Sequence, residues 1–155
     1  MKIQGLKVDY YAGYEGEPEI RFYITPEKVD FRSDRKSGHG EDEIYFFSLW
    51  NGYFSTIAHA LLERANRNSL YSKVPKFLKD WNQHVGWSWD SSIPERLPSE
   101  EITWLCKELA IMQEEKEAYS KELESELTIY DCIRDLMRFL AFAEKENMEI
   151  RVSSE

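Results

Sequence analysis

The chain contains little cysteine and no long hydrophobic run. Cys106 and Cys132 are its only two cysteines among 155 residues, which is typical of a reducing compartment and argues against a disulfide-stapled secreted domain. No apolar stretch approaches the roughly 20 residues that a membrane-spanning helix needs, and residues 1–11 lack the apolar core of a signal peptide. We therefore predict a cytoplasmic protein that makes no membrane contact.

Motifs for catalysis, metal binding or phosphate binding are missing as well. The chain has no GxSxG elbow, no HExxH helix motif and no Gly-rich loop followed by Lys and Ser or Thr, and residues 37–40 (SGHG) are more typical of a polar connection. His59 with Glu63, and Asp80 with His84, have i,i+4 spacing, but each pair lacks a third ligand nearby in sequence. We expect no metal, no cofactor and no enzymatic activity. Both cysteines lie on or beside apolar helix stripes, which predicts burial and not reactivity.

Negative charge is concentrated in the C-terminal part of the chain. The net charge is −9. Residues 1–94 hold 12 Lys and Arg against 13 Asp and Glu, whereas residues 95–155 hold 8 against 16, so the second part carries −8 of the −9. An acidic surface repels phosphate backbones and anionic lipids, so direct nucleic-acid binding is disfavoured and a basic partner is favoured.

Four stretches in the first third of the chain have the patterns of strands. They cover residues 6–10, 20–24, 29–31 and 44–50. Their short connections favour antiparallel neighbours, so we predict a four-stranded antiparallel meander. The fourth strand is apolar on both faces and is expected in a central position. Residues 148–152 also alternate and predict a possible fifth strand at the edge of the sheet.

Helical spacing of apolar residues dominates the rest of the chain. It predicts a helix over 53–68 after an Asn51-Gly52 stop, a shorter helix that begins at Pro75 and ends by Gly86, and two long helices over 99–126 and 129–146. The last two are expected to form an antiparallel hairpin, with one long bent helix as the open alternative. Strands first and helices afterwards indicate an α+β fold. At this length a single domain over residues 1–155 is expected.

A tryptophan-rich loop follows the short helix. Trp81, Trp87 and Trp89 lie close in sequence, with His84 and Asp90 between and beside them, and residues 86–98 read as a long connection. Two interpretations compete. Trp87 and Trp89 fill the core under the loop, which we favour, or they form a binding hot spot together with Asp90.

The main functional hypothesis is a non-enzymatic inhibitor that binds a basic protein, such as a nuclease toxin. Its proposed partner-binding residues are Trp87, Trp89, Asp90 and the carboxylates of the expected acidic helical face, Glu114, Glu115, Glu117, Glu122 and Glu124. Carboxylates imitate the phosphates that a nuclease site attracts and they accelerate association. In this general character, though not in any motif, the chain resembles bacterial immunity proteins and antitoxins.

Two other functions stay open. The first is a small-ligand or enzymatic pocket between sheet and helices, lined by Trp81, Trp87 and Trp89, with His84 and Asp90 as its polar groups. The second is a homo-oligomeric structural protein in which the long helices pair between chains. The sequence does not decide between a monomer and a homodimer.

Overall fold

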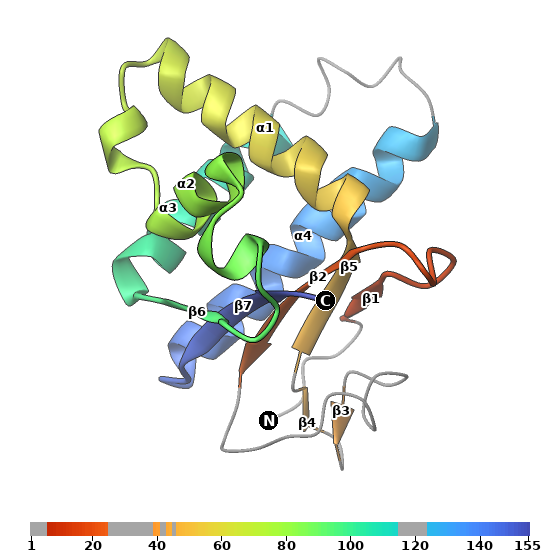
Figure 1. Ribbon diagram of the computed structural model, residues 1–155. Helices are drawn as coiled ribbons and strands as arrows, with labels where there is room; N and C mark the ends of the chain where they lie inside the picture. The colour runs from red at the N-terminus through yellow and green to blue at the C-terminus, as the bar shows by residue number, and fades with distance from the viewer. Residues whose placement is uncertain (1–5, 25–38, 41–42, 45, 115–123) are drawn as a thin grey trace.

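The computed structural model describes residues 6–24, 39–40, 43–44, 46–114 and 124–155, which fold as an α+β domain (Figure 1). Its α-helices are α1 (Asn51–Arg67), α2 (Lys76–Gln83), α3 (Ser99–Glu114) and α4 (Glu124–Lys145), with 3-10 turns η1 (Tyr71–Lys73) and η2 (Gly86–Ser88). Its strands are β1 (Asp9–Tyr10), β2 (Glu19–Ile24), β3 (His39–Gly40), β4 (Glu43–Ile44), β5 (Phe46–Trp50), β6 (Glu95–Leu97) and β7 (Ile150–Ser154). Among these described helices, none is long and apolar enough to cross a membrane.

The expected antiparallel meander is wrong. The main sheet has the order β1-β5-β2-β7-β6, and β1 pairs with β5 in parallel, so the sheet is mixed. Short connections favoured pairing between chain neighbours, but β1 pairs with β5 and β2 pairs with β7, which lie far apart in the sequence. Every residue of β2 and the first four residues of β5 are buried, and each of these two strands has a hydrogen-bonded neighbour on both edges. β5 therefore lies between β1 and β2. The expectation that this apolar strand is central is confirmed.

The C-terminal strand exists but does not lie at the edge. β7 pairs antiparallel with β2 on one side and with β6 on the other, so β6 forms the edge. β6 comes from within the connection that was expected to be an irregular loop over 86–98. Short β3 and β4 form a separate two-stranded sheet, and the expected strand at residues 29–31 lies outside the described residues.

Helix α1 begins directly after β5, at the Asn51-Gly52 pair that was expected to stop the strand. A Cβ built on Gly52 would lie 2.4 Å from ring atoms of Trp50, so the indole covers this glycine. The Trp50 ring is also stacked on Tyr14, with centroids 4.1 Å apart and planes 6° apart. The glycine is therefore used for close packing in a helix and not for a turn.

We expect Gly52→Ala to destabilise the protein, although alanine is the better helix former by about 1 kcal/mol. The new methyl group must displace Trp50 from Tyr14, and overpacking of this kind costs about 1–3 kcal/mol. Urea unfolding checks the net loss. The control is Thr56→Ala, one turn later on an exposed position of α1. A Gly52→Ala protein more stable than the wild type would show that Trp50 moves freely.

The last two helices form the expected antiparallel pair, but with a different boundary. The Ser99 hydroxyl at the start of α3 donates to Glu144 near the end of α4, and the Gln113 amide at the end of α3 donates to the Tyr130 carbonyl. The expected break at residues 125–128 is wrong, because α4 is continuous from Glu124. No Gly or Pro interrupts the chain there, so nothing local ends the helix.

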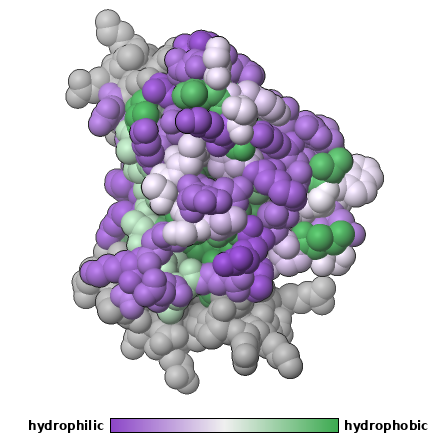
Figure 2. Space-filling model, turned by 90° about the vertical axis from the view of Figure 1, so that its left-hand side faces the viewer, coloured by the Kyte–Doolittle hydropathy of each residue, from purple (hydrophilic) through white to green (hydrophobic). Residues whose placement is uncertain are grey.

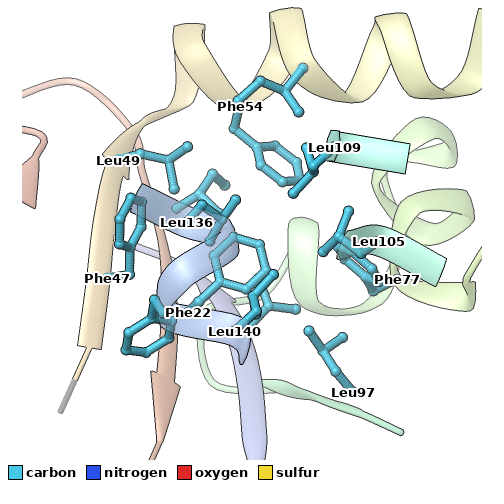
Figure 3. Close-up of a cluster of buried hydrophobic side chains, with 14 of the residues drawn as sticks. Phe22, Phe47, Leu49, Phe54, Phe77, Leu97, Leu105, Leu109, Leu136 and Leu140 are labelled. Carbon is cyan, nitrogen blue, oxygen red and sulfur yellow. The ribbon is translucent and has the colours of Figure 1, made fainter. Parts of the chain in front are cut away.

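One hydrophobic cluster joins the helices to one face of the main sheet (Figure 3). Phe22 of β2 and Phe47 of β5 point into it from the sheet, and Leu109 and Leu140 meet them from α3 and α4. Phe139 lies 5.9 Å from Phe47, centroid to centroid. These contacts span most of the chain, so the described elements share a single core.

Candidate functional site

Helix α2 is ended by a residue whose backbone adopts the left-handed conformation. α2 ends at Gln83, and His84 adopts φ 56°, two residues before Gly86, where the sequence pattern had placed the stop. The Val85 N–H then donates to the Asp80 carbonyl at 3.0 Å, which closes the helix end. The chain turns through η2 and presents residues 85–93 as a defined loop.

Trp87 fixes this loop to the core. Its side chain is 0% exposed and its indole N–H donates to the Phe77 carbonyl at 2.8 Å. Its ring lies edge-on to Phe54 with centroids 5.9 Å apart, and it tilts against Phe77. Trp87 therefore fills the core under the loop, as the favoured interpretation expects, and it cannot contact a partner directly.

Trp89, two residues later, is 80% exposed. Val85 and Ile93, at 45% and 53%, are also among the large exposed hydrophobic residues, so the loop carries three of them within nine residues. The Trp89 and Asp90 N–H groups both donate to the Gly86 carbonyl, at 3.1 and 3.0 Å. The expectation that Trp89 lies in the core is thus wrong, because the η2 turn directs only Trp87 inward. We call residues 85–93 the Trp89 loop.

Asp90 adds a negative charge beside the exposed indole. One carboxylate oxygen accepts the Ser92 hydroxyl at 2.6 Å and the Ser92 N–H at 2.9 Å, and these bonds lower the pKa of Asp90. Among the residues that the structure describes, no Lys, Arg or His forms an ion pair with Asp90. The loop therefore combines an exposed aromatic ring with an ionised carboxylate.

The acidic residues expected on the C-terminal helices are only partly described. Glu114 is exposed at the end of α3, and Glu124 is the first residue of α4. Glu115, Glu117 and Glu122 lie outside the described residues. Farther along α4 the charges balance.

Ion pairs neutralise much of the acid on the described part of α4. Arg134 contacts Asp131 and Asp135, each at 3.3 Å, and Arg138 lies 3.7 Å from Asp135. On α3, Glu108 receives the Arg64 Nε–H from α1 at 2.9 Å. On the described part of the hairpin, Glu108, Asp131 and Asp135 are therefore paired with arginines.

A polar pocket of about 400 Å³ opens beside the Trp89 loop. One stripe of α1, with residues four apart, supplies Asn51, Ser55 and His59. The end of α2 and the following turn supply Trp81, Asn82, His84 and Ser88. Ile20 of β2, Ser154 of β7 and Pro18, which directly precedes β2, complete the lining. Of the three tryptophans expected to line a pocket, only Trp81 does so here, and Asp90 does not contribute.

The pocket does not hold a preformed nucleophile. In the described part of the chain, neither His59 nor His84 is hydrogen-bonded to Ser55 or Ser88, and the Ser88 hydroxyl donates to the Asp80 and Val85 carbonyls. The described residues also contain no group of three His, Cys, Asp or Glu side chains that could hold a metal ion. The lining of this pocket thus provides hydrogen-bonding side chains and the aromatic ring of Trp81.

A second hollow, of about 500 Å³, lies between η1, α2, β6 and α3 and is mostly charged. Its Lys76 ammonium group contacts Asp80 at 2.7 Å and Glu95 at 3.2 Å, and these contacts raise the pKa of Lys76. Glu101 accepts the Lys76 backbone N–H at 2.7 Å, which ties α3 to the start of α2. Figure 2 shows this side of the molecule as mainly hydrophilic, with small and separate hydrophobic patches. The charged side chains that line this hollow therefore link α2 to β6 and to α3.

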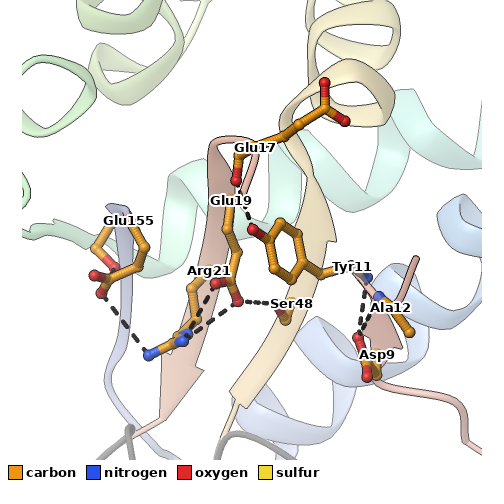
Figure 4. A network of polar contacts seen from close by, with 9 residues as sticks. Asp9, Tyr11, Ala12, Glu17, Glu19, Arg21, Ser48 and Glu155 are labelled. Carbon is orange, nitrogen blue, oxygen red and sulfur yellow. Dashed lines mark hydrogen bonds and ion pairs between the residues drawn. The ribbon is translucent and has the colours of Figure 1, made fainter. Parts of the chain in front are cut away.

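The face of the sheet opposite the core carries a buried polar network (Figure 4). Glu19 and Arg21 of β2 are only 1% and 4% exposed, and their ion pair measures 3.3 Å. The Ser48 hydroxyl donates to Glu19, and Arg21 also lies 3.8 Å from Glu155. The sequence pattern predicted a strand over residues 20–24, but it gave no sign that the charges of Glu19 and Arg21 are buried. Their mutual pairing identifies them as structural residues.

Both cysteines are free thiols. Cys132 is fully buried, as its position in an apolar stripe predicted, whereas Cys106 is half-buried. Burial raises the pKa of Cys106 to about 11 and also raises that of Cys132. At neutral pH both side chains are therefore protonated and poorly nucleophilic.

No protein-family model, no curated protein and no solved structure matches this chain. The candidate sites therefore depend on the residues alone. Sequence reasoning selected Trp89 and Asp90 but missed the polar stripe Asn51, Ser55 and His59. Their i, i+4, i+8 spacing on the polar side of an amphipathic helix was the signal that could have found it.

Proposed function

We propose that the protein is a cytoplasmic, non-enzymatic inhibitor that binds a basic protein, such as a nuclease toxin, through the Trp89 loop. The observation that carries this proposal is the 80% exposure of Trp89 on a loop whose neighbouring residue Trp87 is buried in the core. Exposing a large aromatic side chain forgoes roughly 1.5–3 kcal/mol of burial free energy. Binding a partner recovers that free energy.

The loop is suited to binding because its backbone loses little conformational entropy when a partner associates. Trp87 holds one end in the core, and the Ile93 N–H donates to the Asp90 carbonyl at 3.1 Å at the other end. A side chain presented on a pre-ordered backbone loses less conformational entropy when it is covered. Tryptophan is also among the residues that contribute most to interfaces.

The chemistry of the loop favours an arginine of the partner. An arginine can stack its guanidinium group on the Trp89 indole and donate hydrogen bonds to the Asp90 carboxylate. The net charge of −9 supports this choice, because it attracts a basic protein over a distance. We propose a cytoplasmic location because both cysteines are free thiols, and a reducing compartment keeps thiols reduced.

The test measures affinity for basic nuclease domains. Catalytically inactivated ribonuclease and deoxyribonuclease domains of strongly basic pI, together with the product of the adjacent coding sequence, are titrated with the protein by calorimetry. We expect Trp89→Ala to weaken binding about 30-fold or more, since interface tryptophans contribute about 2 kcal/mol or more. Gln83→Ala, exposed at the end of α2, is the control. Equal affinity of wild type and Trp89→Ala for every nuclease bound would remove the loop from the interface.

The acidic segment is expected to act on the rate of association. Reversing the charge of Glu114, Glu115, Glu117, Glu122 and Glu124 together removes long-range attraction, so the association rate constant falls about tenfold or more at low salt. Stopped-flow measurements at several salt concentrations check this. The difference should shrink as salt screens the charges. An unchanged association rate at low salt would contradict the role of these carboxylates.

A further inference from the structure

The pocket beside the Trp89 loop is lined by ten residues, and none of them is Asp, Glu, Lys or Arg. Charged residues make up 32% of the chain, so about three charged residues in ten would be expected by chance. The second hollow shows the opposite composition, with Lys73, Lys76, Glu95, Arg96, Glu100 and Glu101 in its wall. The uncharged lining therefore distinguishes this pocket within the same molecule.

The pocket offers hydrogen-bonding groups that the described structure does not itself use. Within the described part of the chain, the side chains of Asn51, Ser55 and Asn82 take part in no hydrogen bond. An amide supplies two donors and an acceptor, and a hydroxyl supplies one donor and two acceptor sites. Donors and acceptors thus line the same wall. A ligand that carries both kinds of group fits such a wall best.

Trp81 provides the apolar part of the pocket. It is half-buried, and its ring is held edge-on against Phe54 and His59, with centroids 5.6 and 5.1 Å away. These contacts fix the indole in one orientation. A ring with an apolar face and polar edges can then lie against the tryptophan while its edges meet the amides and hydroxyls.

We infer that this pocket binds a neutral, polyhydroxylated ligand of monosaccharide size. Its 400 Å³ would hold about thirteen waters at roughly 30 Å³ each, which is enough for one sugar ring with some of its hydration shell. The lining holds no Asp, Glu, Lys or Arg side chain to compensate a charged group, so entry of a charged ligand is costly. The pocket shares Ser88 with the Trp89 loop, but the inference does not depend on the protein-binding role proposed for that loop, and it requires no chemical step.

The test uses the indole N–H resonances of the full-length, ¹⁵N-labelled protein. Glucose, galactose, mannose and N-acetylglucosamine are titrated separately to about 50 mM, a range that detects millimolar dissociation constants. We expect at least one of them to shift the Trp81 indole resonance saturably. The Trp87 resonance, whose N–H is bonded to the Phe77 carbonyl in the core, should not move. Glucose 6-phosphate is the charged comparison and should bind more weakly than glucose.

Variants then test whether the sugar binds in this pocket. The double substitution His59→Ala with His84→Gly removes two exposed lining groups, and glycine suits the left-handed backbone of residue 84. We expect it to weaken sugar binding at least tenfold, whereas Asn66→Ala, exposed elsewhere on α1, leaves binding unchanged. The inference is overturned by the absence of a saturable Trp81 shift with all four sugars, by tighter binding of glucose 6-phosphate, or by full affinity in the double variant.

Discussion

Trp87→Ala should lower the free energy of unfolding by about 3–5 kcal/mol, the range expected when a buried aromatic side chain is truncated to alanine. The side chain is fully buried between Phe54 and Phe77, and its loss also leaves the Phe77 carbonyl without the indole donor. Domains of this kind are stable by only about 5–15 kcal/mol, so the effect removes a large share of the total. Urea unfolding followed by circular dichroism measures it.

The matched control for this prediction lies two residues away. Trp89→Ala changes the same residue type, but that side chain is 80% exposed, so its stability effect should stay within about 0.5 kcal/mol. Trp87→Phe should fall between the two, because it keeps an aromatic ring but loses the indole N–H. Equal destabilisation by Trp87→Ala and Trp89→Ala would contradict the division of the two tryptophans between core and surface.

Breaking the buried ion pair on the opposite face of the sheet should have an effect of similar size. Arg21→Met removes the charge but keeps most of the side-chain length, and it leaves Glu19 buried at 1% exposure without its arginine. Removal of one member of a buried pair costs about 3–5 kcal/mol, because the remaining charge stays desolvated. Chemical unfolding of the variant at neutral pH measures this cost.

A double-mutant cycle separates pairing from packing. Glu19→Leu alone should be about as destabilising as Arg21→Met, whereas the two together should cost much less than the sum, because neither charge is then left buried. Ser48→Ala should cost about 1 kcal/mol through its lost hydrogen bond to Glu19. Strictly additive effects of the two charge removals would show that Glu19 and Arg21 do not stabilise one another.

Periodicity predicted the helices well because each one buries a single stripe against a shared core. The buried positions of α1, including Phe54, Ile57 and Leu61, are those that the spacing selected. The helix start at Asn51 was missed because Gly52 usually signals a turn, and only the ring of Trp50 above it explains a glycine inside the helix. A local pattern carries no information about such a contact.

Sheet order was not predictable in the same way. Pairing of β1 with β5 and insertion of β7 between β2 and β6 join segments far apart in the chain, and the alternation that defines a strand does not select its neighbour. The two tryptophans show the same limit. Both look equivalent in the sequence GWSWD, and only the turn at Gly86 decides that Trp87 enters the core while Trp89 faces solvent.

The most direct test of the proposed function is hydrogen–deuterium exchange in a complex with a basic nuclease domain that the protein binds and inhibits. We predict that backbone amides of the Trp89 loop, residues 85–93, exchange more slowly in the complex than in the free protein, and that Trp89→Ala weakens both this protection and the inhibition at the same partner concentration. A stable inhibitory complex in which residues 85–93 exchange as in the free protein, while other elements are protected, would contradict it.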